Sequence, residues 1–329
     1  MQQPRPSPVA QAVALAAAGR VPQAVMLLTQ AGAAGDRASL YQLGAWKLEA
    51  RLVPRDFAQS RELFRRSAQA GSHDAAVVYA NFVANGTGGA ANWQRGLALL
   101  RPLAARDPSC RRRLDLIEAM ELTPAVDPIS LPAGELLCAA PHVELFRGLF
   151  TPAECAYLID SAEPILAPSV VVDPATGRDV PHPGRTSEMA GFTWQLEDPV
   201  VHALNRRLAA LSGTDVTQGE PLQVLRYRPG QEYKPHIDAI PGTDNPRTVT
   251  ILVYLNEEYE GGETYFTAPG LSVRGRLGDA LLFRTLDANG RPNLAAEHAG
   301  MPVTGGTKLI ASRWIHARPY VAPADKGYI

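Results

Sequence analysis

The chain has 329 residues, of which 46% are apolar and 20% charged, so its composition is that of a soluble globular protein with about two domains. Its 32 Lys and Arg residues nearly balance 33 Asp and Glu residues, which gives no support for a nucleic acid or an anionic membrane surface as partner. Three cysteines without a Cys-x-x-Cys spacing, and no apolar run of about 18 residues, argue against a disulfide framework, a structural zinc site and a membrane span, and favour the cytoplasm.

The first third of the chain repeats itself with a period of 36 residues. A shift by this period places apolar or aromatic residues on one another, in the sets Val21, Phe57 and Trp93, and Leu27, Leu63 and Leu99. Within each unit the apolar residues recur at helical spacing, and a glycine-containing turn follows. Such a period predicts an α-solenoid over residues 1–122, in which each unit buries its apolar face against its neighbours. A generic helical bundle is the alternative.

One stretch of this region, "LGAWKLEARLVPRDFAQSRELFRRSAQAGSHDA", resembles the Sel-like branch of the tetratricopeptide repeats. The resemblance implies a domain that binds partners rather than one that catalyses a reaction. We therefore expect these repeats to recruit a protein or peptide substrate, or to stabilise the domain that follows.

Proline-punctuated sequence, "ELTPAVDPISLPAGELL", ends the helical pattern and predicts a linker over residues 123–137. The second domain, residues 138–329, is expected to contain helices at Thr151–Glu163 and Pro199–Leu211. Its later part contains short β-rich runs, which are "LQVLRYR", "RTVTILVYLN", "ETYFTA", "DALLFRT" and "TKLIASRWIHARPY". Short strands with turn signals between them predict a double-stranded β-helix, or jelly roll, and an α+β multidomain chain overall.

Three potential metal ligands stand in this second domain. His236 and Asp238 form a His-x-Asp pair within "RYRPGQEYKPHIDAI", and His298 follows sixty residues after Asp238. A His-x-Asp on one strand with a distant His on a later strand is the pattern of a 2-His-1-carboxylate triad, which binds Fe(II) and leaves coordination positions open. Lys308, ten residues beyond His298, would neutralise the far carboxylate of a 2-oxoacid, because an unpaired buried ammonium is unfavourable.

Residues from about 140 to 320 resemble the prolyl 4-hydroxylase branch of the Fe(II)/2-oxoglutarate-dependent dioxygenases. The matching motifs run in order along nearly the whole second domain, as "LFTPAECAYLID", "GRTSEMAGF", "LQVLRYRPGQEYKPHID", "RTVTILVYLNEEYEGGETYF", "GDALLF" and "HAGMPVTGGTKLIASRWIH". The resemblance implies Fe(II), 2-oxoglutarate and O2 as cofactors, with L-ascorbate as a further candidate.

The resemblance also implies roles for individual residues. The expected metal ligands are His236, Asp238 and His298. The expected 2-oxoglutarate-binding residues are Lys308, which pairs with the C5 carboxylate, and its hydrogen-bonding companions Tyr227 and Thr264. The residues expected near the substrate are Arg247 and Trp314, with Tyr233 near the iron and a mobile loop, Val172–Thr186, over the substrate.

Plainer interpretations of single residues are also open. Tyr227 and Trp314 could be core aromatics, and Thr264 an ordinary strand residue. His316 is predicted to be a surface strand residue, and Cys155 a packing residue. Gly261 and Gly262 are expected to form a hairpin turn with positive φ.

The predicted function is hydroxylation of a C–H bond, with release of succinate and CO2, and the expected target is a peptidyl proline hydroxylated at carbon 4. The alternatives are a hydroxylase of another residue or of a small molecule, and a repeat-based adaptor with an inactive jelly roll. A nucleic-acid substrate is disfavoured, because the nucleic-acid branch of this superfamily is expected to use an arginine where Lys308 stands. The second domain is also acidic, which opposes binding to a phosphate backbone.

Overall fold

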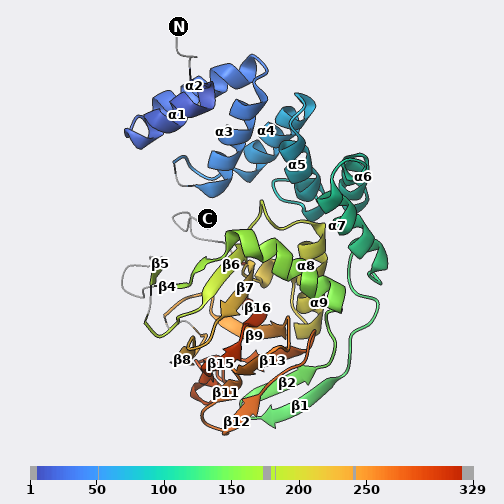
Figure 1. The fold of residues 1–329 in the computed structure, drawn as a ribbon, viewed down its shortest axis with the longest axis vertical. Coiled ribbons are helices and arrows are strands. Elements are labelled where there is room, and N and C mark those ends of the chain that lie inside the picture. The colour runs from blue at the N-terminus through green and yellow to red at the C-terminus, as the bar shows by residue number, and fades with distance from the viewer. Residues whose placement is uncertain (1–5, 51, 173–178, 182, 240–241, 321–329) are drawn as a thin grey trace. The chain divides into compact units, whose positions relative to one another are not determined.

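The computed structural model describes residues 6–50, 52–172, 179–181, 183–239 and 242–320 (Figure 1). It divides into two compact units. Of the described residues, those up to 119 together with 193–202 form the first unit, and the others form the second. None of the helices in these ranges is long and apolar enough to cross a membrane.

The first unit is a series of consecutive helices, in which each helix packs against the next along the chain. They are α1 (Pro8–Ala17), α2 (Val21–Ala33), α3 (Arg37–Glu49), α4 (Phe57–Gln69), α5 (His73–Asn85), α6 (Trp93–Ala104) and α7 (Pro108–Ala119). Capping side chains explain where several of them begin. Asp36, Asp56, Ser72 and Asn92 each accept a hydrogen bond from the backbone N–H three residues further on, which satisfies an amide that the helix leaves without a partner.

The sequence period appears in contacts between successive helix pairs. Arg37 donates to the carbonyl oxygen of Gly71 at 2.9 Å, and His73 lies 2.8 Å from the carboxylate of Asp107. Both contacts join residues 34 positions apart, and the second contact is the first one shifted along the chain by the sequence period of 36 residues. Gly96 lets α5 and α6 approach closely, because a Cβ at this position would lie 2.5 Å from that of Ala84.

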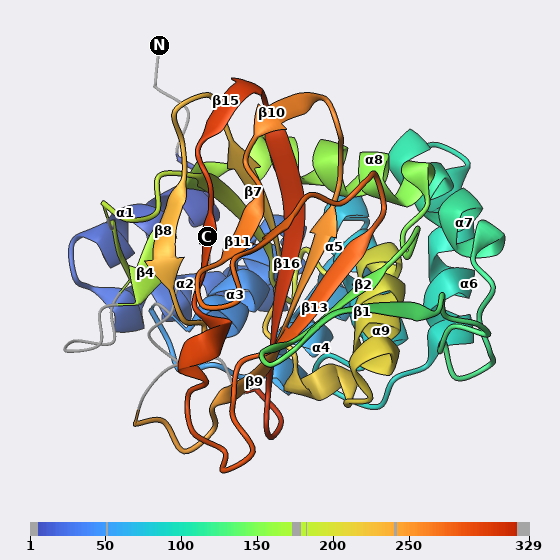
Figure 2. The same cartoon turned by 90° about the horizontal axis from the view of Figure 1, so that it is seen from below.

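The second unit consists of antiparallel sheets with two longer helices, α8 (Pro152–Ala162) and α9 (Pro199–Ser212), of which α9 begins in the first unit. The larger sheet has the strand order β1-β2-β13-β9-β16-β7-β6-β3 and the smaller one the order β12-β11-β14-β8 (Figure 2). The strands of the larger sheet are β1 (Gly134–Ala139), β2 (His142–Phe146), β3 (Ala167–Pro168), β6 (Glu188–Phe192), β7 (Leu222–Tyr227), β9 (Arg247–Tyr254), β13 (Ala280–Arg284) and β16 (Lys308–His316). Those of the smaller sheet are β8 (Tyr233–His236), β11 (Thr264–Phe266), β12 (Leu271–Val273) and β14 (His298–Gly300).

Two strand pairs lie outside these sheets, β4 (Val170–Val172) with β5 (Asp179–Pro181) and β10 (Tyr259–Gly261) with β15 (Val303–Gly306). Gly261 and Gly262, at the end of β10, have φ angles of 66° and 68°, so the predicted positive φ is confirmed. The predicted hairpin is wrong, because β10 pairs with β15 and the next strand, β11, belongs to the smaller sheet. β1 begins at Gly134 and so overlaps the last four residues of the predicted linker, 123–137. In the predicted substrate loop, Val172–Thr186, residues 173–178 and 182 lie outside the described residues.

The core of the second unit is made by side chains from both main sheets. Leu225, Leu252 and Phe283 come from the larger sheet, and Phe266 and Val273 come from the smaller one. The rings of Phe266 and Phe283 meet edge to face, with centroids 5.1 Å apart, an arrangement that aromatic pairs favour. The two sheets therefore share one apolar interior.

Both helices predicted in this unit are present. Thr151 caps α8 in a reciprocal capping box with Glu154, which is the start signal that the sequence contains. Glu154 also pairs with Arg207 of α9 at 2.8 Å. Cys155 is fully buried, as predicted for a packing residue. The coarse prediction of N-terminal helices followed by antiparallel sheets is thus confirmed.

Candidate active site

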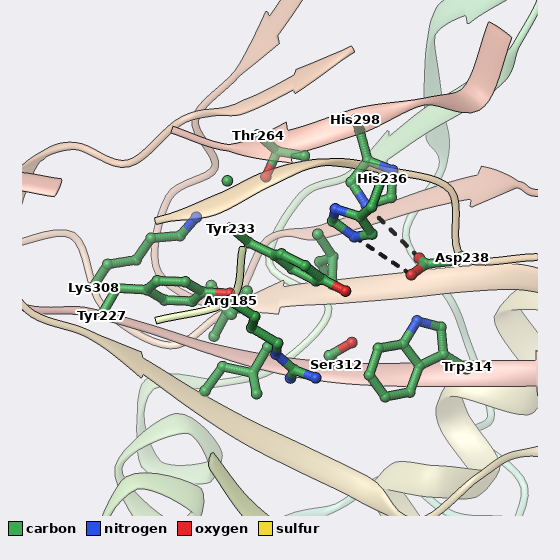
Figure 3. A pocket seen from close by; sticks show the side chains of 14 residues that line it. Arg185, Tyr227, Tyr233, His236, Asp238, Thr264, His298, Lys308, Ser312 and Trp314 are labelled. Carbon is green, nitrogen blue, oxygen red and sulfur yellow. Dashed lines mark ion pairs between the residues drawn. The ribbon is translucent and has the colours of Figure 1, made fainter. Parts of the chain in front are cut away.

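His236, Asp238 and His298 lie together between neighbouring strands of the smaller sheet (Figure 3). His298 of β14 is the direct cross-strand partner of His236 at the end of β8, so both rings project from the same face. Asp238 follows β8 by two residues, and its two carboxylate oxygens lie 3.6 Å from His236 Nε2 and 3.7 Å from His298 Nε2. One ligand atom from each residue fits within 4.8 Å of the others, a spacing at which one metal ion can contact all three.

The backbone fixes the orientation of both imidazoles. The Nδ1 atom of His236 donates to the carbonyl oxygen of Lys234 at 2.8 Å, and that of His298 to the carbonyl oxygen of Ala296 at 3.1 Å. These bonds place a proton on Nδ1 and direct Nε2 of each ring at Asp238, the arrangement found in metal-binding histidines. Burial, together with the neighbouring His298, lowers the pKa of His236. Its imidazole is therefore neutral at neutral pH, which is the form that binds a metal.

Asp238 is held as a buried carboxylate. Burial by itself would raise the pKa of Asp238, but His298, His236 and Arg247 together lower it. The hydroxyl of Thr250, on β9, donates to Asp238 Oδ2 at 2.6 Å, which fixes the orientation of the carboxylate. A buried, oriented carboxylate beside two imidazoles is a donor set that suits Fe(II).

Lys308 carries an ammonium group into the interior of the second unit. It is the first residue of β16 and pairs with Tyr227 of β7 across the sheet. Its side chain is 2% exposed, and Nζ donates to the carbonyl oxygen of Gly262 at 2.6 Å. Burial lowers the pKa of Lys308 to about 8, against the opposing charge of Glu263. This cation therefore favours a buried anion as its partner.

One pocket contains both the histidine-carboxylate cluster and Lys308. Lys308 and Thr264 lie at one end of it, and Asp238 and Trp314 at the other (Figure 3). Its lining residues are Arg185, Leu225, Tyr227, Tyr233, His236, Asp238, Leu252, Thr264, His298, Gly300, Lys308, Ile310, Ser312 and Trp314. Tyr227, Thr264 and Trp314, for which plain packing roles were the alternative, are all buried and line this pocket.

Arg247 is the one residue of the predicted site that does not line the pocket itself. It lies behind Trp314, with its guanidinium carbon 4.1 Å from the centroid of the indole ring. Its Nε donates to Glu220 at 2.6 Å, and a second nitrogen donates to the backbone oxygen of Asp238 at 3.4 Å. Arg247 is thus placed to support Trp314 and the loop that carries Asp238.

The prediction for His316 was wrong. This residue is buried at the end of β16, and its Nε2 lies 2.9 Å from the carboxylate of Glu220. Burial alone would raise the pKa of Glu220, but Arg247 and His316 hold it at about 2. The alternation of β16 would place His316 and Trp314 on the same side of the sheet, and the buried Glu220 explains why a histidine is tolerated there.

Three further polar residues belong to the pocket or its immediate support, although the sequence analysis gave none of them a role. Ser312 lines the pocket, and Thr250 holds Asp238. Arg185 is 6% exposed, and its Nε and Nη2 atoms have no hydrogen-bond partner among the described residues. The sequence signals for Arg185 were its place in the motif "GRTSEMAGF" and in the predicted substrate loop, Val172–Thr186.

Tyr233 stacks on His236. The two ring centroids are 3.5 Å apart and the ring planes differ by 18°. This contact restricts rotation of the imidazole, because the hydrogen bond to Lys234 and the stacked ring act on the same side chain. The predicted place of Tyr233 beside the cluster agrees with this geometry.

Comparison with known proteins gives this pocket a context. The sequence profile of the 2OG-Fe(II) oxygenase superfamily matches residues 222–316. Prolyl 4-hydroxylase 1 of Arabidopsis thaliana is 34% identical over 203 residues, which cover 56% of this chain and 72% of the relative. The chain belongs to the prolyl 4-hydroxylase family. Prolyl 4-hydroxylase subunit alpha-1 of Rattus norvegicus is 35% identical over 188 residues, or 54% of this chain and 35% of that subunit.

Solved structures of similar proteins correspond to different parts of the chain. The viral collagen prolyl hydroxylase of Paramecium bursaria Chlorella virus-1, in its 2-oxoglutarate complex, is 28% identical, with coverage of 55% of this chain and 99% of that one and a TM-score of 0.45. A Sel1 repeat protein from Oxalobacter formigenes is 20% identical, with coverage of 33% and 85% and a TM-score of 0.30.

As a member of the prolyl 4-hydroxylase family, the chain is a 2-oxoglutarate-dependent oxygenase, with Fe(II), 2-oxoglutarate and O2 as its cofactors. The pocket fits these groups. Two imidazoles and one carboxylate suit Fe(II), and the buried ammonium of Lys308 suits a carboxylate of the cosubstrate.

Proposed function

We propose that the chain hydroxylates proline residues of a peptide or protein at carbon 4, and that 2-oxoglutarate is converted to succinate and CO2 in the same turnover. The observation that carries this proposal is the presence of the histidine-carboxylate cluster and a buried ammonium in one pocket. The relatives named as prolyl 4-hydroxylases support proline as the target.

In this proposal His236, Asp238 and His298 hold the iron. When bound, Fe(II) supplies the activation of O2 that oxidises a C–H bond of the substrate. The protein contributes neutral imidazoles whose Nε2 atoms face the metal position, because each Nδ1 is bonded to a backbone carbonyl. Thr250 orients the carboxylate of Asp238.

Lys308, Tyr227 and Thr264 are proposed to bind the C5 carboxylate of 2-oxoglutarate. The Lys308 ammonium is 5.5 Å from the Tyr227 ring centroid, and Thr264 Oγ1 lies 3.2 Å from the hydroxyl of Tyr254. These groups form a buried part of the pocket that contains one cation. A bound carboxylate would therefore replace the carbonyl oxygen of Gly262 as the partner of Lys308.

Trp314, supported by Arg247, is proposed to face the substrate. Trp314 Nε1 has no hydrogen-bond partner among the described residues, so it can donate to a carbonyl oxygen of a bound peptide. Arg247 supports the indole from behind. Both residues lie toward the end of the pocket that is remote from Lys308.

We also propose the finer architecture that the sequence predicts, with an α-solenoid over residues 1–122, a linker over 123–137 and a jelly roll within 138–329. Successive contacts 34 residues apart support the solenoid, and two antiparallel sheets around one apolar interior support the jelly roll. A cytoplasmic location is proposed because all three cysteines are free. Neither a nucleic acid nor a membrane is proposed as a partner. The proposed partner is a protein or peptide substrate that the helical unit recruits.

The function is tested with the full-length chain, Fe(II), 2-oxoglutarate and synthetic peptides that contain proline in an extended sequence. We expect succinate and a peptide heavier by one oxygen atom, with fragmentation placing that oxygen on the proline. A matched peptide with alanine in place of proline should remain unmodified. Omitting ascorbate tests whether this reductant is needed.

Other outcomes of this assay separate the alternatives. An added oxygen on another residue, or only on a free metabolite, would replace proline as the substrate. A chain that produces no succinate from 2-oxoglutarate with any substrate would be an inactive adaptor. A protein substrate hydroxylated equally well without involvement of the helices would contradict recruitment.

Thr250→Val tests the proposed support of the metal site. Valine keeps the shape of threonine but removes the hydroxyl that donates to Asp238, so we expect metal affinity to fall by about 10- to 100-fold. Thr250→Ser, which keeps the hydroxyl, should bind metal nearly as the wild type does. Co(II) titration followed by absorbance measures this without turnover. Equal affinity in the valine and serine variants would remove Thr250 from the support of the site.

A further inference from the structure

Residues Thr193–His202 belong to the helical unit, although the strands from β1 to β6 lie between them and α7 in the sequence. We propose that the helices of the first unit hold residues 193–202 of their own chain as an intramolecular ligand. The assignment does not depend on the proposed reaction, because it concerns only contacts within the first unit.

The first half of the segment is held through an aromatic side chain. The ring of Trp194 lies 5.0 Å from that of Phe57, at the start of α4. The guanidinium carbon of Arg55 lies 4.5 Å from the Trp194 ring centroid. Next to it, Gln195 donates to the hydroxyl of Tyr41, on α3, at 2.8 Å. Arg55 also lies 5.7 Å from the Phe57 ring centroid, so the cation and the two rings contact one another, which is a more specific arrangement than apolar cover alone.

The second half is held through its backbone and an acidic side chain. The side-chain amide of Asn85, at the end of α5, donates to the backbone oxygen of Glu197. Asp198 pairs with Arg113 of α7 at 3.1 Å, and their side chains are 6% and 19% exposed. Such a largely buried ion pair depends on its exact partner, because removal of either side leaves a charge without compensation.

These contacts reach four of the helices. Trp194 and Gln195 meet α3 and α4, Glu197 meets α5, and Asp198 meets α7. The segment is compact, with a turn at residues 194–196 and the start of α9 from Pro199, and from this form its side chains and backbone contact the helices of the first unit. The preferred peptide is one with an aromatic residue followed four positions later by an acidic one. It follows that a recruited protein substrate would need another face of the helices, or would have to displace residues 193–202.

The first test is amide hydrogen exchange in the full-length chain. Trp194→Ala is expected to raise exchange across residues 193–202 by at least about tenfold, because the segment would open locally from the helices. The matched control is Leu196→Ala, since Leu196 belongs to the same segment and is 36% exposed. This variant should change exchange by less than about threefold. Tyr41→Phe removes one hydroxyl and should raise exchange near Gln195 without unfolding any helix.

The second test asks whether the helices recognise the segment as a ligand. A fluorescein-labelled peptide of sequence TWQLEDPVVH is titrated with the full-length chain and followed by fluorescence polarisation. We expect the peptide to bind the Trp194→Ala variant, whose own segment is released, and not the wild type, whose surface is filled. Adding Arg55→Ala to that variant should abolish binding. The proposal is wrong if the peptide does not bind the Trp194→Ala variant, or if it binds the wild type equally well. It is also wrong if amide hydrogen exchange of residues 193–202 is unchanged in Trp194→Ala and Tyr41→Phe.

Discussion

Replacing His298 by alanine is expected to abolish iron retention and 2-oxoglutarate turnover. His298 is 4% exposed, and its Nε2 lies 3.7 Å from Asp238. Without it only one imidazole and one carboxylate remain to hold the metal. Since loss of a group that merely supports a ligand weakens metal binding by about 10- to 100-fold, loss of a ligand itself should exceed about 100-fold. Iron content after dialysis and succinate formation measure the two effects separately.

His142→Ala is the matched control for this substitution. His142 is a half-buried histidine of the same unit, at the start of β2, where its ring lies 3.3 Å from Glu144. Its removal should leave iron binding and succinate formation unchanged. If His298→Ala kept wild-type iron and succinate production, the assigned triad would be wrong. If both variants lost iron, the cause would be a general loss of structure, which a melting curve would show.

Replacing Lys308 by alanine is expected to weaken 2-oxoglutarate binding much more than metal binding. A charge-assisted contact of this kind contributes about 1.5–3 kcal/mol, or about tenfold to more than a hundredfold in affinity. Lys308→Met separates the lost charge from the lost volume and should show nearly the same loss. Lys308→Arg should restore little, because a planar guanidinium differs from a compact ammonium. The Lys308 chain is also closely packed, with Cδ 3.2 Å from where a Cβ on Gly262 would lie.

The pH dependence of 2-oxoglutarate binding gives an independent check of Lys308. Burial lowers the pKa of Lys308 to about 8 in the free protein, and a bound carboxylate favours the charged form. Below about pH 7 the ammonium is already present, and affinity should not change with pH. Above about pH 8 binding must take up a proton, so the dissociation constant should rise by up to about tenfold per pH unit.

Isothermal titration of 2-oxoglutarate at several pH values, with the metal present, measures this slope. Lys308→Met should lose the pH dependence together with the affinity. An alanine or methionine variant with unchanged 2-oxoglutarate affinity would remove Lys308 from the site. A wild-type slope that persisted in Lys308→Met would assign the proton to another group.

Part of the site could be predicted from the sequence because the chemistry demands particular residue types at particular places. A His-x-Asp pair with a later histidine and lysine points to metal and 2-oxoacid chemistry, even where each motif alone is weak. The pocket then contains His236, Asp238, His298 and Lys308 together. The helix at 152–162 could be predicted as well, because Thr151 and Glu154 form a local capping signal.

Other features depend on partners that sequence spacing does not reveal. His316 was predicted to be exposed, but Glu220, 96 residues away in the chain, receives it in a buried pair. Thr250 reaches Asp238 across 12 residues, and no motif distinguishes this threonine from the other β-branched residues of its strand. Arg185 likewise becomes a pocket residue only because its chain pairs beside Tyr233.

The sequence alone was enough to predict the helical first part, two helices and five strands of the second domain, the family resemblance and the residue types of the site, since these depend on periodicity, capping and short motifs along the chain. The tertiary structure alone decided which faces are buried, how the imidazoles are oriented and which unit residues 193–202 join. The physical reason is that burial and hydrogen bonding are set by strands and helices that meet in space. A local pattern shows that a residue can pack or form a hydrogen bond, but its partner is determined by the element that folds against it.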